Sequence, residues 1–352
     1  MSAFAIGVDL GGTNLRIAAI DESGSLLEKI TMRTRVEDGP AVVIDRMSAS
    51  IQQLAAKYSP GARLLGAGVG IPGIIELRTG TLRESPNLPG WHDYPVRDAI
   101  ERRLGAPVIL ENDANAAAFG ETWLGAARDS GSMTMITLGT GVGGGIVING
   151  RIWHGMTGMA GELGHITVDP NGPRCGCGNI GCAEQYASAS AIMRMAREKI
   201  EGGHAAELAR FASSPDAEFN AKLVHNLAVQ GDRPAREIFQ VVGWALGILV
   251  ADLINALNLP MYVIGGGVSA SWEMFSPAMF RELRKRSLIY TATAPADTRD
   301  VEAGDLASPP EALAGHTIVT RAVLGSDAGL YGAARLPMVA HERETHMHSP
   351  KA

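Results

Sequence analysis

Residues 4–20 read FAIGVDLGGTNLRIAAI, an apolar run, a Gly11-Gly12-Thr13 turn and a second apolar run. Apolar runs of this length separated by glycine predict two β-strands joined by a tight hairpin. Residues 133–148 repeat the pattern, with a glycine-rich turn over 139–145 between two apolar runs. This internal repeat favours two similar α/β lobes over one doubly wound sheet.

Helical and extended patterns between and after these hairpins complete an alternating α/β order. Apolar residues at helical spacing predict helices over 42–54, 114–124, 187–200 and 235–257. Short apolar runs predict strands over 64–69, 108–110 and 261–264. Asn112 and Asp113 therefore stand at a strand-to-helix corner, a common place for sites in α/β proteins. We expect a surface loop over 297–316 and a frayed end from His341 onward.

Composition indicates a globular protein of about two domains. The chain has 352 residues, 46% of them apolar, which is more than one ordinary core accommodates. The net charge of −6, from 31 basic and 37 acidic residues, gives no sign of a nucleic-acid or anionic-membrane surface. Met1–Asp9 lacks the pattern of a signal peptide, and no uncharged run approaches the ~20 residues of a membrane span. With three thiols that need reducing surroundings, these features predict a cytoplasmic protein.

All three cysteines of the chain lie near one histidine in the segment 165–182. The set is His165, Cys175, Cys177 and Cys182, the one-imidazole, three-thiolate ligands of a closed tetrahedral zinc site. Glycines between them let a short backbone fold around an ion, namely Gly176, Gly178 and Gly181. The alternative is three unrelated buried thiols, but their concentration favours metal. The sequence predicts a structural zinc with no open position for activating water.

The two glycine turns are candidates for phosphate binding. After Asp9, the first turn offers backbone N–H groups to an anion, and the carboxylate can hold the magnesium that accompanies phosphates. A glycine hairpin is often only a turn, but two at equivalent places favour a nucleotide triphosphate between lobes. No Gly-Lys-Ser/Thr follows either turn, so neither is a Walker loop. The first turn leads into a strand, which disfavours a dinucleotide fold.

Seven ordered motifs across nearly the whole chain resemble the ROK family of repressors, open reading frames and kinases. They are DLGGTNLR at 9–16, GIPG at 70–73, PNLPGW at 86–91, ENDAN at 111–115, GTGVGGG at 139–145, GELGH at 161–165 and CGCGNIGCAE at 175–184. Among family members, the wording is most similar to bacterial ATP-dependent glucokinases. The resemblance implies two ribonuclease-H-like lobes of the actin and hexokinase superfamily, with an interdomain active-site cleft for sugar and ATP.

The same resemblance implies domain limits. An N-terminal lobe over 1–113 is completed by a C-terminal helix around 326–338. A C-terminal lobe spans 114–325 and carries the zinc loop, and residues 339–352 form a flexible tail. The family also implies a homodimer.

Roles follow from the resemblance residue by residue. Asp113 matches the catalytic base, which takes the proton of the sugar 6-hydroxyl as that oxygen attacks the γ-phosphoryl group. An aspartate here is also typical of a helix N-cap. Positions that match ATP-phosphate contacts are Gly11, Gly12, Thr13, Thr140 and Gly141. Positions that match the adenosine-side turn are Gly265, Gly266 and Gly267. Arg16 matches a basic position of the first phosphate motif, or is an ordinary salt-bridge partner.

Sugar recognition is implied for a mixed polar set. Its members are Asn87, Asn112, Glu162, His165 and Glu184, with the backbone around Gly73. His165 would use one ring nitrogen for zinc and the other toward the sugar or its carboxylate neighbours, so zinc would shape the pocket. The departures from the family pattern are Ala189, where glycine is common, and Glu76, where aspartate is frequent.

The leading interpretation is an ATP-dependent kinase that converts D-glucose to glucose 6-phosphate. Kinases of the same family for N-acetylmannosamine, N-acetylglucosamine, allose or fructose stay open. A sugar-responsive repressor is disfavoured because the first strand begins by Phe4, without room for a preceding helix-turn-helix. An actin-like or chaperone ATPase would not account for a zinc loop beside Glu162 and Glu184.

Overall fold

The computed structural model describes residues 2–214, 218–295 and 315–348. The chain divides into two compact units. Unit 1 comprises Met1–Gly131, Gly145–Gly161 and Val323–Ala352, and unit 2 comprises Ser132–Gly144 and Glu162–Ala322. The loop expected over 297–316 lies outside the described residues except for its last two positions.

The sheet of unit 1 has the order β3-β2-β1-β4-β7. Its strands are β1 (Ala3–Leu10), β2 (Asn14–Asp21), β3 (Leu26–Arg33), β4 (Arg63–Ile71) and β7 (Val108–Asn112). β1 pairs antiparallel with β2 and parallel with β4, and β4 pairs parallel with β7. Because β1, β4 and β7 run in the same direction, their carboxyl ends meet at one edge of the sheet. A separate hairpin joins β5 (Ile74–Glu76) to β6 (Thr81–Glu84).

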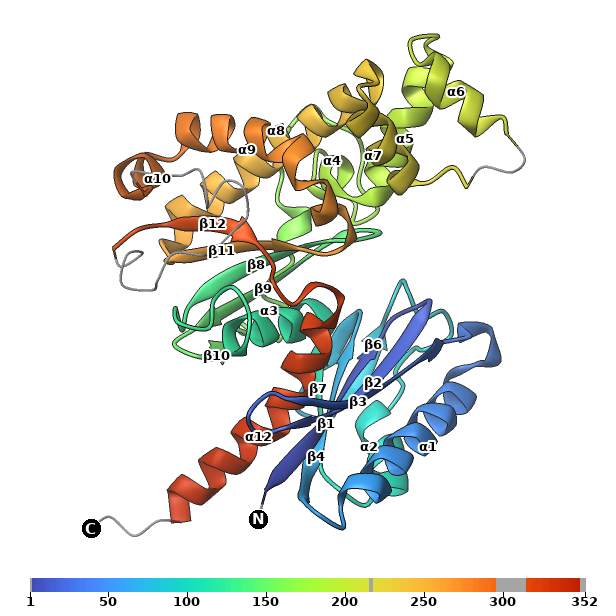
Figure 1. Ribbon diagram of the computed structural model, residues 1–352, viewed down its shortest axis with the longest axis vertical. Helices are drawn as coiled ribbons and strands as arrows, with labels where there is room; N and C mark the ends of the chain where they lie inside the picture. The colour runs from blue at the N-terminus through green and yellow to red at the C-terminus, as the bar shows by residue number, and fades with distance from the viewer. Residues whose placement is uncertain (1, 215–217, 296–314, 349–352) are drawn as a thin grey trace. The chain divides into compact units, whose positions relative to one another are not determined.

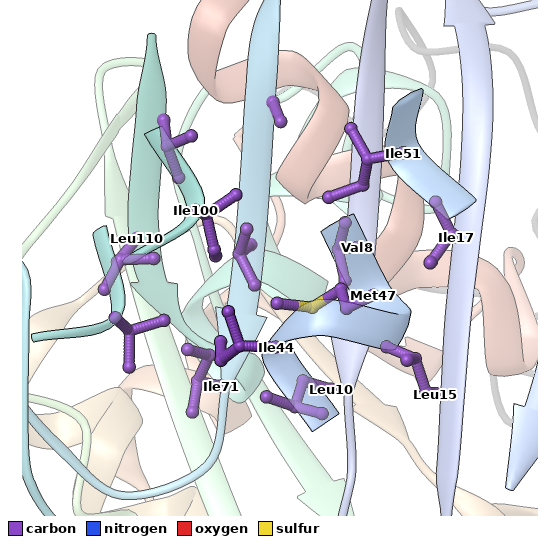
Figure 2. Close-up of a cluster of buried hydrophobic side chains, with 14 of the residues drawn as sticks. Val8, Leu10, Leu15, Ile17, Ile44, Met47, Ile51, Ile71, Ile100 and Leu110 are labelled. Carbon is purple, nitrogen blue, oxygen red and sulfur yellow. The ribbon is translucent and has the colours of Figure 1, made fainter. Parts of the chain in front are cut away.

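Helices cover both faces of this sheet. On one face lie α1 (Pro40–Tyr58) and α2 (Val96–Leu104), and on the other lies α12 (Ala328–His348) (Figure 1). Branched and long apolar side chains fill the α1 face; those labelled in Figure 2 are Val8, Leu10, Leu15, Ile17, Ile44, Met47, Ile51, Ile71, Ile100 and Leu110. Smaller residues face α12 and allow a close approach. A Cβ on Gly68 would lie only 1.8 Å from the Ala333 carbonyl oxygen.

Helix α3 (Asp113–Trp123) belongs to unit 1, where it packs on α12. A Cβ on Gly120 would lie 2.2 Å from the Ala328 carbonyl oxygen, so glycine lets the two helix backbones touch. This packing explains why unit 1 continues past α3 to Gly131 and does not end at residue 113, the limit expected from the sequence.

Helix α12 continues to His348, through part of the range 339–352 for which a flexible tail is expected. Residues 339–345 are rich in good helix formers, and Arg335 pairs with Glu342 at 2.6 Å across two turns. Residues 342–345 are therefore exposed on a helix.

The second sheet has the order β10-β9-β8-β11-β12. Its strands are β8 (Met133–Leu138), β9 (Val142–Ile148), β10 (Arg151–Ile152), β11 (Met261–Gly265) and β12 (Ile318–Arg321). β11 pairs parallel with both β8 and β12. The unit boundary at Gly144 and Gly145 falls within β9.

The described residues of unit 2 also form seven α-helices. They are α4 (Glu184–Ala187), α5 (Ala189–Glu201), α6 (Ala206–Ala212), α7 (Ala221–Gln230), α8 (Arg233–Leu257), α9 (Trp272–Arg286) and α10 (Leu288–Thr293). α8 is long and apolar enough to cross a membrane by length and composition, but 72% of its most apolar window is buried. It packs closely on α9, since a Cβ on Gly243 would lie 2.1 Å from the Phe275 carbonyl oxygen. These contacts are those of a core helix.

The predicted repeat of strand, glycine turn and strand is confirmed by β1–β2 and β8–β9. The second turn is shorter than the expected 139–145, because Val142 already begins β9. Gly145 serves packing instead: its Cβ would lie 2.7 Å from that of Ala118. The helix expected over 187–200 begins at Ala189, after the separate short helix α4.

The substitution Gly68→Ala tests the close packing of α12. The added methyl group meets the Ala333 backbone, so we expect a loss of about 1 to 3 kcal/mol and a Tm lower by several degrees in calorimetry. Gly61→Ala is the matched control, because a Cβ there meets nothing within 4 Å. Equal Tm values for the two variants would contradict this packing.

Candidate active site

The corner between β7 and α3 is shaped by Asn112. This residue caps α3, with its Oδ1 accepting hydrogen bonds from the backbone N–H groups of Ala114 (3.0 Å) and Asn115 (3.3 Å). The expected N-cap role of Asp113 is therefore filled by Asn112, which has the extended backbone that a cap requires. Asp113 is the first helical residue, and its Oδ1 accepts from Ala114 N at 2.9 Å. A carboxylate at this position is favoured by the positive end of the helix dipole.

Strand register brings Asp9 to the same sheet edge as this corner. Asp9 on β1 lies opposite Gly70 on β4, and Gly70 lies opposite Glu111 on β7. A Cβ on Gly70 would be 3.6 Å from the Asp113 Cα, so a larger side chain would press on the first turn of α3. The fold of unit 1 thus gathers Asp9 with its glycine hairpin and the β7–α3 corner at one edge of the sheet.

Asp9 is paired with Arg16, its partner across the β1–β2 hairpin. Arg16 Nη1 donates to Asp9 Oδ2 at 2.8 Å and to the Ser326 carbonyl oxygen at 3.2 Å. Burial raises the pKa of Asp9 above its ordinary value, and the Arg16 guanidinium partly offsets that rise. Of the two readings of Arg16, the structure shows the salt bridge.

Hydrogen bonds from Thr34 hold the glycine hairpin that follows Asp9. Thr34, fully buried, donates its hydroxyl to the Gly11 carbonyl oxygen at 2.6 Å, and its backbone N–H donates to the Thr13 carbonyl oxygen at 2.9 Å. A Cβ on Gly12 would lie 2.6 Å from the Asn87 carbonyl oxygen. Gly12 therefore seats the Asn87 loop against the hairpin, while the tip residue Thr13 is exposed.

Gly73 is required by backbone geometry. Its φ of 118° lies in the region that favours glycine, and a Cβ would be 2.3 Å from the Glu84 carbonyl oxygen. Its own carbonyl oxygen is 3.5 Å from Asn112 Nδ2. The backbone around Gly73 thus lies beside the capping asparagine.

In unit 2, the predicted zinc ligands form one cluster. The ligand atoms of His165, Cys175, Cys177 and Cys182 all lie within 4.8 Å of one another. His165 Nδ1 is 3.6 Å from Cys175 Sγ, and Cys177 Sγ is 3.7 Å from Cys182 Sγ. Zinc bonds of about 2.0 to 2.3 Å would separate tetrahedral ligand atoms by roughly 3.5 to 3.8 Å. The four residues therefore fit a zinc ion.

The backbone of this loop is folded on itself in the way that the glycines allow. Cys175 N donates to the Asn179 carbonyl oxygen at 2.8 Å, and Gly178 N donates to the Cys175 carbonyl oxygen at 3.0 Å. Gly178 and Gly181 have φ values of 93° and 67°, which side chains rarely adopt. Gly176 has neither a positive φ nor a close neighbour, so the structure gives no reason for glycine there.

The two ring nitrogens of His165 face different groups. Nδ1 faces the thiolates, whereas Nε2 lies 3.9 Å from Glu162 Oε2. Glu162 keeps 61% of its side chain exposed, which leaves its carboxylate available to a ligand. The double role expected of His165, toward zinc and toward the sugar, stays a prediction.

Glu184 joins the zinc loop to the second glycine turn. Its Oε2 accepts from Val142 N at 2.9 Å, and its Oε1 is 4.0 Å from Cys175 Sγ. A Cβ on Gly141 would lie 2.3 Å from Glu184 Oε2, so glycine is needed there by the protein itself. Ser190 Oγ donates to the Thr140 carbonyl oxygen at 2.8 Å and holds the other side of the turn.

Ala189, the departure from the family pattern, lies against the same turn. Its backbone N–H donates to the Gly139 carbonyl oxygen at 2.9 Å. The close approach is made by the backbone, so alanine serves as well as glycine in this contact.

Two of the three glycines in the turn after β11 pack closely on β8. A Cβ on Gly265 would lie 2.6 Å from Met135 Cε, and one on Gly266 would lie 2.5 Å from the Leu138 carbonyl oxygen. Both glycines are thus explained by packing on β8. In contrast, a Cβ on Gly267, the third glycine of this turn, would meet nothing within 4 Å.

Sequence reasoning assigned no role to several residues that hold these groups. Thr34 and Ser190 brace the two turns, and a buried Glu111 pairs with His154 behind the β7–α3 corner. Two signals could have pointed to Glu111: it is the first residue of the ENDAN motif, and it is an acidic residue near the end of a buried strand. Nothing in the local pattern of His154 pointed to its distant partner.

Comparison with known proteins places the chain in a family, because the model of the ROK family matches residues 5–338. The chain belongs to the ROK family. It is 39% identical over 320 residues to a glucokinase of Thermotoga maritima, covering 91% of this chain and 98% of that protein. It is 32% identical over 286 residues to a putative xylose repressor of Caldicellulosiruptor sp., covering 81% and 71% respectively.

A solved structure agrees with this membership. The ROK family glucokinase from Streptomyces griseus, in complex with glucose and AMPPNP, matches with a TM-score of 0.72 and 34% identity, covering 95% of this chain and 99% of that one. The predicted fold class of this ROK protein, two α/β lobes of the actin and hexokinase type, is confirmed.

Substitution of Cys177 tests the metal cluster. We expect the parent chain to hold about one zinc per chain and Cys177→Ser to lose most of it in elemental analysis, with a lower Tm, because ligation contributes to folding. Cys177 is exposed, so its replacement disturbs little apolar packing. Ser188→Ala, a nearby change outside the ligand set, is the control and should keep its zinc. A parent protein that contains no zinc, and whose Tm equals that of Cys177→Ser, would contradict the assignment of these residues as zinc ligands.

Proposed function

We propose that this ROK family member is an ATP-dependent hexokinase that phosphorylates the 6-hydroxyl of D-glucose, with Asp113 as general base. The observation that carries the proposal is the shared sheet edge of unit 1, where Asp113 follows β7 and Asp9 with its glycine hairpin follows β1. A proton acceptor and a phosphate-side acid are what transfer to a hydroxyl requires. The class of enzyme, an ATP-dependent sugar kinase, follows from the family and its glucokinase relatives.

Asp113 would accept the proton of the sugar hydroxyl as that oxygen attacks the γ-phosphoryl group. Hydrogen-bond reach is the first requirement of a general base, and the cap formed by Asn112 fixes the first turn that carries Asp113. The Gly11-Gly12-Thr13 turn would supply backbone N–H groups to the phosphates. Asp9 has the hard oxygen ligands that suit Mg²⁺, which when bound with ATP neutralises phosphate charge.

Asn112 would act toward the sugar as a donor. Its Oδ1 already accepts two backbone N–H groups, and its Nδ2, which has two hydrogens, donates one to the Gly73 carbonyl oxygen at 3.5 Å, so the second N–H of Nδ2 would meet a hydroxyl oxygen. Asn87, Glu162, His165 and Glu184 are proposed as the other sugar contacts, with Gly73 lining the pocket. A missing hydroxyl would leave such buried groups unpaired, at about 1 to 3 kcal/mol each.

Unit 2 would supply the remaining contacts. Thr140 and Gly141 are proposed for phosphates and the turn 265–267 for adenosine. A zinc ion on the cysteine loop would fix His165 and, through it, the pocket. Closure of the two units over sugar and ATP, a homodimer and a cytoplasmic location stay predictions.

The choice of glucose over other hexoses rests on the glucokinase relatives, whereas the repressor relatives leave it open. A coupled ADP assay with glucose, N-acetylmannosamine, N-acetylglucosamine, allose and fructose decides it. We expect the highest kcat/KM with glucose. A higher kcat/KM with N-acetylmannosamine would assign the enzyme to that sugar instead.

Replacement of the base gives a direct test. Asp113→Asn should lower kcat by about 10² to 10⁴-fold, because the general base is lost, while calorimetry still detects glucose binding. Asp129→Asn is the control, since Asp129 is exposed and pairs with its neighbour Arg128. Turnover of Asp113→Asn at the control rate would refute the base assignment.

Arg16→Leu tests the electrostatics of Asp9. Arg16 holds the pKa of Asp9 down against the effect of burial, so its removal raises that pKa further and protonates Asp9 at higher pH. We expect the acid limb of kcat/KM for Mg·ATP to move to higher pH. Arg103→Leu, which breaks a comparable Arg–Asp pair elsewhere in unit 1, should leave the limb in place. If kcat/KM for Mg·ATP depends on pH in the same way in both variants, Arg16 does not control the pKa of Asp9.

A further inference from the structure

Glu111 is a buried acid whose hydrogen-bonding capacity is used on both oxygens. Only 3% of the residue is exposed. Oε1 accepts from the backbone N–H of Asn112 and from Asn115 Nδ2, both at 3.0 Å, and Oε2 is 2.7 Å from His154 Nε2. A carboxylate buried to this extent persists only when it is paired and hydrogen-bonded. The three contacts therefore account for its presence at the end of β7.

These contacts surround Asp113. Asn112 precedes it and Asn115 lies two residues after it on the first turn of α3. Oε1 of Glu111 thus accepts hydrogen bonds from the residue before Asp113, through the backbone N–H of Asn112, and from a residue after it, through the side chain of Asn115. The cap made by Asn112 depends on the same peptide orientation. Glu111 therefore fixes the backbone from which the Asp113 carboxylate projects.

His154 is the distant anchor of this arrangement. It lies on the segment after β10, where Trp153 N donates to the Ile146 carbonyl oxygen at 2.8 Å and Ala160 N donates to the His154 carbonyl oxygen at 3.2 Å. Its side chain is 34% exposed, while that of Glu111 is 4% exposed. The hydrogen bond to Glu111 raises the pKa of His154 above its ordinary value. The chain segment leading to Glu162 is therefore tied to the corner that carries Asp113.

We propose that Glu111 and His154 are positioning residues for Asp113, acting through the first turn of α3. The inference rests on the proposed function of Asp113 as general base. Neither residue touches the reacting atoms in this role. A misplacement of about 1 Å in a reacting group can lower a rate by about 10²-fold, so loss of the anchor acts on kcat.

The test compares His154→Phe, which keeps a ring but no donor, with His154→Gln, which keeps a donor. We expect His154→Phe to lower kcat by about 10- to 100-fold with KM for glucose within about threefold of the parent. His154→Gln should recover kcat to within about threefold. His204→Leu, on an exposed histidine of unit 2 outside the site, is the control and should match the parent. A parental kcat in folded His154→Phe would overturn the proposal.

Hydrogen exchange supplies a readout that does not depend on kinase activity. The amides of Ala114 and Asn115, capped by Asn112, should exchange at least about tenfold faster in His154→Phe and at a near-parental rate in His154→Gln. If His154→Phe does not fold, Glu111→Gln takes its place, because it keeps one acceptor for the backbone but loses the charge. Unchanged exchange in the variant that folds would overturn the proposal. A parent chain that phosphorylates no hexose would refute the proposed function and leave this readout valid.

Discussion

The parallel register of β1, β4 and β7 is the constraint on which the account of this protein depends. Three strands that run in one direction end at one edge, and their order places Asp9, Gly70 and Glu111 side by side. Apolar burial against α1 on one face and glycine-mediated contact with α12 on the other fix the strands. A slip of one residue in any pair would turn these side chains to the opposite face. Core packing in unit 1 therefore sets the position of the proposed chemistry.

In unit 2, the proposed contacts lie on loops and not at strand ends. The second glycine turn is held by Glu184 and Ser190, and Glu184 in turn lies beside the cysteine cluster. Loops of this kind have little apolar contact to order them, so a metal ion is an effective substitute for a core. Glu184 and the adjoining cysteine cluster would therefore hold both the proposed phosphate contacts and the proposed sugar contacts of unit 2.

Local patterns in the sequence sufficed for the elements and for the groups with distinctive spacing. Short stretches of sequence predict three such features: the glycine hairpins, the corner at Asn112 and Asp113, and the cluster of His165 with the cysteines. Contacts between distant residues could not be predicted in this way. Glu111 and His154 are 43 positions apart, and the ENDAN motif that contains Glu111 gives no sign of His154. The same reason explains α3: its assignment to unit 1 depends on Gly120 meeting α12, more than 200 residues later.

The most direct test is a crystal structure of the chain with glucose and a non-hydrolysable ATP analogue. The account predicts that the glucose 6-hydroxyl lies within about 2.6 to 3.2 Å of an Asp113 carboxylate oxygen, on the side of the γ-phosphate. A glucose molecule bound away from Asp113, or one whose 6-hydroxyl contacts a different acid, would contradict it.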